Sequence, residues 1–486
     1  MSTRTRDTEL LLCLFAVEGA IVTLGLSAYK KAGRPLTEFL PTWPGLVFLL
    51  SIVVVGLSLI AAAARSRRRA WADIRFTLVM NVIVLLLTGG VLEGLVRGLS
   101  VREDSQLRFA GTTLLPRSWT EEVVRSRESL SRMPLAERYF TFDAILGWTV
   151  APDRRSANGL YVSSPAGIRS SSQGLTFPER GASSARIALV GDSFTFGLEV
   201  TYEDTWGAQL ESALGHGIQV LNFGVDGYGV DQAYLRYRRD VRPWRPDVVV
   251  LGLIDHDFVR TMSVYSFLAF GEGAWPFPKP RFVLTQEGIE IVNVPLPSPE
   301  AILAEPSVGD LPFITYDMAY NAADWESRFY YASYFVRFML SRFPRLPRRP
   351  DERWRQEADE LNRRIVRKLM KESQAEDTAV LIVYMPSRWP LEHYRDMATE
   401  SEVQRILRAE GLAFIDTAPC VRAVPPSERF VGRHYSRQTN ARVAQCLVEP
   451  VTRLLNQRRV RHRAQVERLG PRLFTSRSSP DLDTPK

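Results

Sequence analysis

The feature that most constrains the fold is a regular alternation of short apolar segments with amphipathic segments, beginning near residue 186. Apolar runs rich in Val, Ile and Leu are typical of strands buried on both faces of a sheet. They are residues 186–190, 218–223, 247–253, 378–384 and 412–416. Segments with helical spacing lie between them, at residues 205–214, 231–239, 352–374 and 398–410. This alternation predicts an α/β fold, a three-layer, doubly wound parallel sheet of the flavodoxin-like type.

The domain organisation follows from where this alternation begins, pauses and ends. We expect a membrane anchor at 1–100, a juxtamembrane lead-in at 101–180, the α/β domain at 181–456 and a basic, mostly disordered tail at 457–486. An insertion at about 259–349 separates the third strand from the fourth. It contains a predicted hairpin (282–286 with 289–294) and an aromatic-rich helix (328–343).

Three long apolar stretches, residues 10–29, 43–64 and 76–95, are each near the length of about 20 residues that spans a bilayer. The alternative is a signal peptide followed by buried core helices. The loop between the second and third stretches is rich in arginine, which places it in the cytoplasm by the positive-inside rule. We therefore expect three transmembrane helices in the inner (cytoplasmic) membrane, with the rest of the chain on the periplasmic or extracytoplasmic side.

The net charge of +8 and the pI of about 9.4 arise largely from arginines that flank these stretches and from the tail. This distribution favours a membrane protein over a nucleic-acid-binding one, and no nucleic-acid partner is expected. Cys13 lies in the first apolar stretch, whereas Cys420 and Cys446 lie in the exported part. An oxidising compartment would allow these two to form a disulfide; two free buried thiols are the alternative.

Candidate reactive residues follow the predicted strands. Ser193 comes just after the first strand, in the tight, glycine-containing turn 191–197, where its hydroxyl and backbone N–H reach the carboxyl edge of the sheet. A glycine-rich loop, 222–229, follows the second strand, and His256 follows the third. His434 lies near the C-terminus, before a helical segment at 440–455. A lone histidine is usually a surface or core residue, but two of the five histidines of the chain, His256 and His434, fall at positions expected for a crevice of this sheet.

Together these motifs resemble the SGNH (GDSL) hydrolase superfamily, in particular its membrane-anchored bacterial members, over about residues 142–455. The segments 142–148 and 167–169 also look like the lead-in of that family. The resemblance implies that Ser193 is the nucleophile and His434 the general base. It also implies an oxyanion hole formed by the amides of Ser193 and Gly227, and it implies no metal and no cofactor.

The sequence departs from the family pattern at two positions. His256 stands where the family has an oxyanion-binding asparagine; a neutral imidazole can also donate one N–H, so we expect an oxyanion or substrate role, with a structural role as the alternative. The second departure is that no carboxylate lies two or three residues before His434. Either a backbone carbonyl orients a Ser–His dyad, or a distant acid such as Asp416 or Glu428 substitutes.

Asp192 and Asp257, which adjoin Ser193 and His256, are expected to support the site. The function implied by the resemblance is a membrane-anchored ester hydrolase that acts on O-acetyl esters of cell-surface or exported carbohydrate. The alternatives are a polysaccharide O-acetyltransferase supplied by an acyl-donor membrane protein, a non-catalytic binding or scaffolding module, and a hydrolase of lipids or thioesters.

Overall fold

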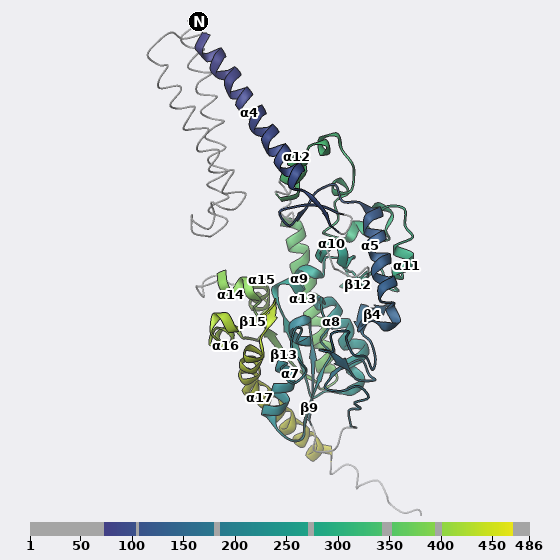
Figure 1. Ribbon diagram of the computed structural model, residues 1–486. Helices are drawn as coiled ribbons and strands as arrows, with labels where there is room; N and C mark the ends of the chain where they lie inside the picture. The colour runs from purple at the N-terminus through teal and green to yellow at the C-terminus, as the bar shows by residue number, and fades with distance from the viewer. Residues whose placement is uncertain are drawn as a thin grey trace, which may run out of the picture. The chain divides into compact units, whose positions relative to one another are not determined.

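The computed structural model describes residues 72–103, 106–178, 185–270, 277–342, 352–393 and 401–469 (Figure 1). The chain divides into two compact units. One comprises Met1–Val101 with Ala332–Phe338, and the other comprises Arg102–Tyr331 with Met339–Lys486. The second unit contains the sheet, most of the lead-in and the insertion except Ala332–Phe338.

The centre of the second unit is a seven-stranded sheet in the order β14-β13-β10-β8-β9-β7-β6. Its strands are β6 (Val162–Ser163), β7 (Arg169–Ser170), β8 (Ala185–Val190), β9 (Ile218–Asn222), β10 (Val248–Leu253), β13 (Ala379–Tyr384) and β14 (Phe414–Asp416). The five from β8 to β14 are parallel, and β7 and β6 extend the sheet antiparallel beyond β9. In chain order the parallel strands lie 2-1-3-4-5, which is the flavodoxin-like order. The predicted doubly wound parallel sheet is confirmed.

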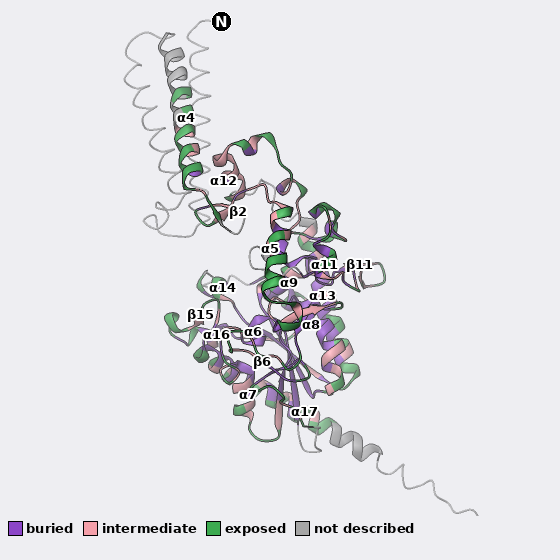
Figure 2. Cartoon of the chain, turned by 45° about the vertical axis from the view of Figure 1, so that its right-hand side comes forward, coloured by how far each residue is buried: buried purple, intermediate pink, exposed green. Residues whose placement is uncertain are grey.

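Helices cover both faces of the sheet, and every residue of the central strand β8 is therefore buried. Ile187 and Leu189 belong to one apolar core, together with side chains of α7 (Trp206–Leu214) and α17 (Arg437–Leu469). The intervening Ala188 and Val190 belong to the other core, which is covered by α8 (Val230–Arg236), α13 (Glu352–Ala375) and α15 (Glu402–Ala409). Figure 2 shows the buried strands between these helices.

The lead-in and the insertion complete the second unit. The lead-in hairpin, β4 (Phe140–Asp143) with β5 (Gly147–Val150), inserts Trp148 into the second core. The insertion and α5 (Trp119–Arg132) enclose a smaller core around Trp119. The predicted hairpin of the insertion is present as β11 (Phe282–Leu284) and β12 (Ile289–Ile291). The other helices of this region are α9 (Asp255–Arg260), α10 (Ser266–Phe270) and α11 (Pro299–Ile302).

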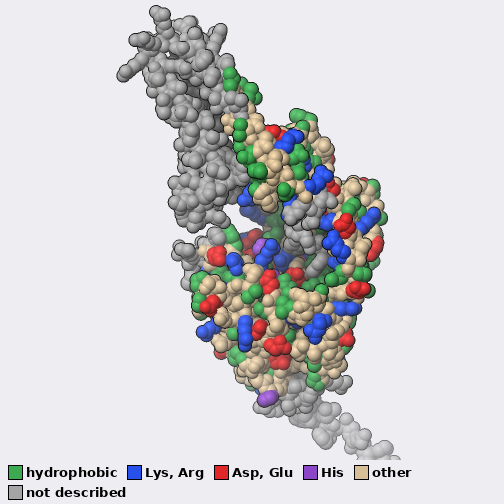
Figure 3. All heavy atoms as spheres, in the orientation of Figure 1, with side chains coloured by type: hydrophobic (Ala, Val, Ile, Leu, Met, Phe, Trp, Pro, Cys, Tyr) green, Lys and Arg blue, Asp and Glu red, His purple; other side chains and the backbone are tan. Residues whose placement is uncertain are grey.

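The described residues also form several short elements. They are the strands β1 (Val101–Glu103), β2 (Gln106–Phe109), β3 (Thr112–Thr113), β15 (Phe430–Val431) and β16 (His434–Tyr435), and the helices α6 (Ser193–Phe196), α14 (Arg388–His393) and α16 (Ala418–Arg422), with several 3₁₀ turns. On the face in Figure 3, basic and acidic side chains are interspersed over the described surface.

One sequence prediction of local structure was wrong, and the described part of the tail differs from the expected disorder. The aromatic-rich segment is not one helix: a 3₁₀ turn, Phe329–Ala332, precedes α12 (Tyr334–Arg342), because Ser333 Oγ accepts the amide of Val336 and starts a new helix there. The basic tail is helical at first, since α17 continues to Leu469. Arg458 holds that part of the helix to the sheet by an ion pair with Asp247 and by a 2.7 Å hydrogen bond to the Asp377 carbonyl.

The described part of the first unit consists mainly of α4 (Ala72–Leu99). Two of the three predicted spans, 10–29 and 43–64, lie outside the described residues, and the third falls within α4. Within the described part of the chain, no helix reaches the length and apolar character needed to cross a membrane.

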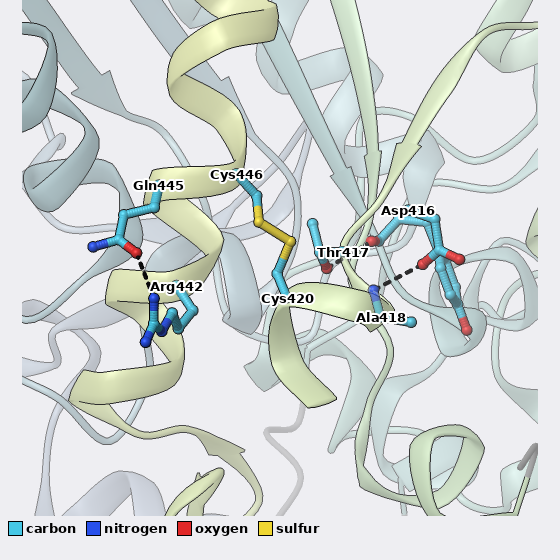
Figure 4. Close-up of a disulfide and its surroundings, with 8 residues drawn as sticks. Asp416, Thr417, Ala418, Cys420, Arg442, Gln445 and Cys446 are labelled. Atoms are coloured by element: carbon cyan, nitrogen blue, oxygen red, sulfur yellow. Dashed lines mark hydrogen bonds between the residues drawn. A yellow bond between two sulfur atoms is a disulfide. The ribbon is translucent and has the colours of Figure 1, made fainter. Parts of the chain in front are cut away.

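A disulfide joins Cys420 of α16 to Cys446 of α17, with their Cα atoms 6.6 Å apart (Figure 4). It closes a loop across a sequence separation of 26 residues and lies beside the end of β14. The disulfide fixes α16 to α17, the long helix that packs on the sheet and that follows the strand of His434 in the sequence.

Candidate active site

Ser193 is the first residue of α6, directly beyond the central strand β8. Asp192 caps this helix, since its Oδ1 accepts the amide of Phe194 at 2.9 Å. Ligands of open α/β sheets bind beyond the carboxyl ends of the strands, where the strand order reverses. Here the order reverses at β8, so the fold places Ser193 at that point.

His434 approaches Ser193 from a short hairpin formed by β15 and β16. Its Nε2 lies 2.9 Å from Ser193 Oγ. The imidazole packs against the ring of Phe194, with 5.0 Å between ring centroids, and its side chain is 12% exposed. Nε2 can accept the Ser193 hydroxyl proton only in the tautomer that carries its own proton on Nδ1.

The other nitrogen of this ring faces Glu199. Nδ1 of His434 lies 3.2 Å from Glu199 Oε2, although the angle at Nδ1 is not that of a hydrogen bond. The same carboxylate accepts the backbone amides of Arg433, at 2.9 Å, and of His434, at 3.1 Å. Bonds between catalytic groups are often poorly aligned before substrate binds. The acid beside the histidine therefore comes from the loop that follows the serine.

This position of the acid differs from the one expected from the sequence. Asp416 accepts the side chain of Gln404 at 2.9 Å and the amide of Ala418 at 2.9 Å, at the end of β14. Glu428 is exposed in a 3₁₀ turn. Neither Asp416 nor Glu428 has an ion pair with His434 among the described residues; of the alternatives left open by the sequence, a distant acid does lie beside the histidine, but it is Glu199.

Gly227 lies on the loop after β9, with φ of 76°. The loop is joined to the serine turn by a 3.1 Å bond from the amide of Val225 to the carbonyl of Gly191. Trp148 holds it from the other side, because the indole donates to the carbonyl of Asp226 at 2.8 Å. Among the described residues, the amides of Ser193 and Gly227 have no hydrogen-bond acceptor, so both can donate to a ligand.

Arg260 of α9 connects the loops of the site. Its Nη1 donates to Asp192 Oδ2 at 3.2 Å, to Asp257 Oδ1 at 2.8 Å and to the carbonyl of Tyr228 at 2.9 Å. Asp257 also accepts the amide of Ile254 at 2.9 Å. Burial and the neighbouring Asp192 raise the pKa of Asp257, and Arg260 opposes this effect. Asp192 and Asp257, through Arg260, therefore connect the serine turn, the loop after β9 and α9.

His256 is the second residue of α9 and is exposed. Loss of hydration at its ring and the positive charge of Arg260 lower its pKa, which favours the neutral ring. A neutral ring has one N–H to donate. The structure shows no hydrogen bond from His256 to Ser193, and a role in oxyanion binding stays a prediction.

Glu199, Arg260 and Trp148 were not expected from the sequence as parts of the site. Trp148 lies in a lead-in segment that the sequence did single out, but a tryptophan there gives no sign of its carbonyl partner. Arg260 is three residues beyond Asp257, the spacing of an ion pair within a helix. No group of three or more His, Cys, Asp or Glu side chains suited to a metal ion occurs in the described part of the chain.

Comparison with known proteins gives structural similarities only. No family model matches the sequence, and no curated protein matches it. A member of the lipolytic protein G-D-S-L family from Veillonella parvula DSM 2008 is 11% identical, with 56% of this chain and 100% of that chain covered and a TM-score of 0.30. A catalytic mutant of the acetylxylan esterase Axe2 from Geobacillus stearothermophilus is 15% identical, with 57% and 96% covered and a TM-score of 0.29. The lipase/acylhydrolase from Enterococcus faecalis is 14% identical, with 55% and 95% covered and a TM-score of 0.28.

A TM-score of this size does not decide the fold. The fold rests on the strand order, the parallel register and the placement of the helices described above.

Proposed function

We propose that the protein is a serine esterase that hydrolyses O-acetyl esters of cell-surface or exported carbohydrate through Ser193 and His434. The observation that carries the proposal is the 2.9 Å contact between Ser193 Oγ and His434 Nε2 at the carboxyl edge of the sheet. A hydroxyl with a base in hydrogen-bond reach is the arrangement of an activated nucleophile. The carbohydrate substrate rests on the resemblance of the sequence motifs alone.

In the proposed reaction His434 Nε2 takes the proton of Ser193 as Oγ attacks the acetyl carbonyl carbon. The amides of Ser193 and Gly227, with His256 as a third donor, stabilise the negative charge on the carbonyl oxygen. The C–O bond to the sugar then breaks, and the leaving alkoxide receives the proton from His434. Water, deprotonated by the same nitrogen, releases acetate and restores the serine. If a sugar hydroxyl replaces water in this last step, the protein is an O-acetyltransferase.

We also propose that the catalytic domain works on the periplasmic or extracytoplasmic side of the inner membrane. The apolar stretches before residue 100 and the arginines between them support this location. The disulfide between Cys420 and Cys446 supports it independently, because such bonds persist in oxidising compartments.

The test uses the full-length chain with p-nitrophenyl acetate, longer p-nitrophenyl esters and acetylated oligosaccharides. Ser193→Ala and His434→Ala should each lower kcat by about 10³-fold or more, with a preference for acetyl over long acyl chains in the parent protein. Ser212→Ala and His216→Ala are matched controls, since both residues are exposed at the other end of the domain, near the start of β9. Their kinetics should equal those of the parent.

Mass spectrometry of the reacted protein should show acetyl on Ser193. Free acetate as product indicates a hydrolase, whereas an acetyl group transferred to an added sugar acceptor indicates a transferase. Turnover that persists in both the Ser193 and His434 variants would refute the mechanism. The absence of turnover and of acetyl transfer on every ester would favour a binding module instead.

A further inference from the structure

Glu199 is the carboxylate nearest to the proposed base. Among the described residues it alone has a carboxylate oxygen within 4 Å of His434, with Oε2 3.2 Å from Nδ1. We propose that Glu199 is the positioning residue of the site, holding His434 in the tautomer that accepts the Ser193 proton. This inference rests on the proposed function, and it places the third member of the triad on the loop that follows the nucleophile helix α6.

The chain holds Glu199 in a backbone conformation that is unfavourable for a glutamate. Its φ is 69°, in the left-handed region that side chains other than glycine rarely adopt. The amide of Glu199 donates to the hydroxyl of Tyr161 at 3.0 Å. The next carbonyl, that of Val200, accepts from Arg169 Nη2 at 2.6 Å. Strained residues of this kind persist where surrounding contacts fix them, and they are frequent at active sites.

Arg169, which holds this loop, is a buried charged side chain, and its burial costs free energy of hydration. The residue is 1% exposed, and burial lowers its pKa to about 10. Its guanidinium carbon lies 4.8 Å from the ring centre of Tyr161 and 4.3 Å from that of Phe196. Among the described residues Arg169 has no ion pair with an acid, and a buried charge without one contributes little net stability. We infer that Arg169 serves to fix the loop that carries Glu199, through its hydrogen bond to the Val200 carbonyl.

The chain also leaves room for the carboxylate on the histidine side. Gly432 stands two residues before His434, at one of the two positions where the family resemblance expects an acid. A Cβ at that position would lie 2.5 Å from Glu199 Oε1 and 2.6 Å from Oε2. The carboxylate therefore occupies the space that a side chain at 432 would fill.

Glu199 would act through His434 and not on the substrate. When Nε2 takes the serine proton, the ring carries a positive charge and its Nδ1 proton faces the carboxylate. Glu199 stabilises that charge and remains ionised throughout, so no proton passes to it. The charge of His434 also lowers the pKa of Asp226, but this carboxylate is not within ion-pair distance of the ring.

A purely structural role is the rival explanation, because Glu199 also accepts two backbone amides of the hairpin. Glu199→Gln separates the two roles. The amide keeps an oxygen for both backbone N–H groups and nearly the same volume, but it removes the charge. The matched control is Glu203→Gln, an exposed residue four positions along the same loop.

The experiment measures kcat and KM of the full-length protein on p-nitrophenyl acetate, and the rate at which a fluorophosphonate labels Ser193. In Glu199→Gln, kcat and the labelling rate should fall about 10²- to 10⁴-fold with KM changed less than about threefold. Formate should restore part of kcat in Glu199→Ala, where it fits the vacated space, and not in Glu199→Gln. Glu203→Gln should match the parent.

The outcomes distinguish this inference from the function on which it rests. If Ser193→Ala retains full activity, the proposed function fails. If Ser193→Ala is inactive while Glu199→Gln keeps its kcat and labelling rate, the function stands and the role of Glu199 is refuted. A loss of kcat in Glu199→Ala that formate does not relieve, with normal kcat in Glu199→Gln, shows a structural role and also refutes it.

Discussion

Gly432→Ala should displace Glu199 without altering any group that reacts. The new Cβ would begin 2.5 Å from Oε1 and 2.7 Å from Cδ of Glu199, whereas real Cβ contacts essentially never fall below 3.0 Å. The carboxylate must therefore shift by about 0.5 Å or more, which disturbs its 3.2 Å approach to Nδ1 of His434. Misplacement on the scale of 1 Å can cost about 10²-fold in rate. We expect kcat on p-nitrophenyl acetate to fall about 10²-fold.

The backbone contributes a separate effect on stability. Gly432 has φ of 56°, where an alanine costs about 1 kcal/mol relative to glycine. Gly411 is the matched control, because its φ is 64° and nothing lies within 4 Å of an added Cβ. Gly411→Ala should lose a similar free energy of unfolding in urea and keep its kcat. A difference in kcat between the two variants then reports the clash with Glu199 and not the strain.

A double-mutant cycle completes the test. If Gly432→Ala acts by displacing the carboxylate, the substitution should have little further effect on kcat in the Glu199→Gln background, where the charge is already gone. Additive losses in the double variant would show that the two residues act independently. Equal kcat values for Gly432→Ala and Gly411→Ala would refute the reasoning outright.

Three further predictions concern the surroundings of the site. His256→Ala should lower kcat about 10²-fold if the ring donates to the oxyanion, with His256→Asn retaining most activity; unchanged kcat in the alanine variant contradicts that role. Replacing Cys420 and Cys446 by serine should lower the free energy of unfolding by about 3 kcal/mol, as the 26-residue separation implies, and both thiols should resist alkylation in intact cells until reduced. Lys279 and Asp231 form an ion pair in which neither side chain is exposed. Lys279→Met should lower the free energy of unfolding in urea by about 3–5 kcal/mol, because it leaves the Asp231 charge buried without a partner cation. The double variant Lys279→Met/Asp231→Leu should recover much of that free energy.

The fold was predictable because its signal is local. Each parallel strand is an apolar run that needs no knowledge of its neighbours, and the polar turns after β8 and β10 mark the carboxyl edge of the sheet. Helix ends were harder to predict. The extension of α17 to Leu469 depends on Arg458 reaching Asp247 and Asp377, which are far away in sequence.

The acid of the site could not be predicted in this way, because 235 residues separate Glu199 from His434. The sequence does carry a trace of the arrangement, however. Gly432, two residues before the histidine, leaves room for a side chain from elsewhere in the chain, because an added Cβ there would lie 2.5 Å from Glu199 Oε1. The filling residue should be acidic and should lie on a loop that is already tied to the nucleophile, and Glu199 meets both conditions. The same reasoning applies to a variant with both Gly432→Asp and Glu199→Gly. In this variant the carboxylate beside His434 would be attached at position 432 and not at position 199. If kcat in that variant exceeds that of Glu199→Gly alone, the site requires a carboxylate at this place and not a particular residue.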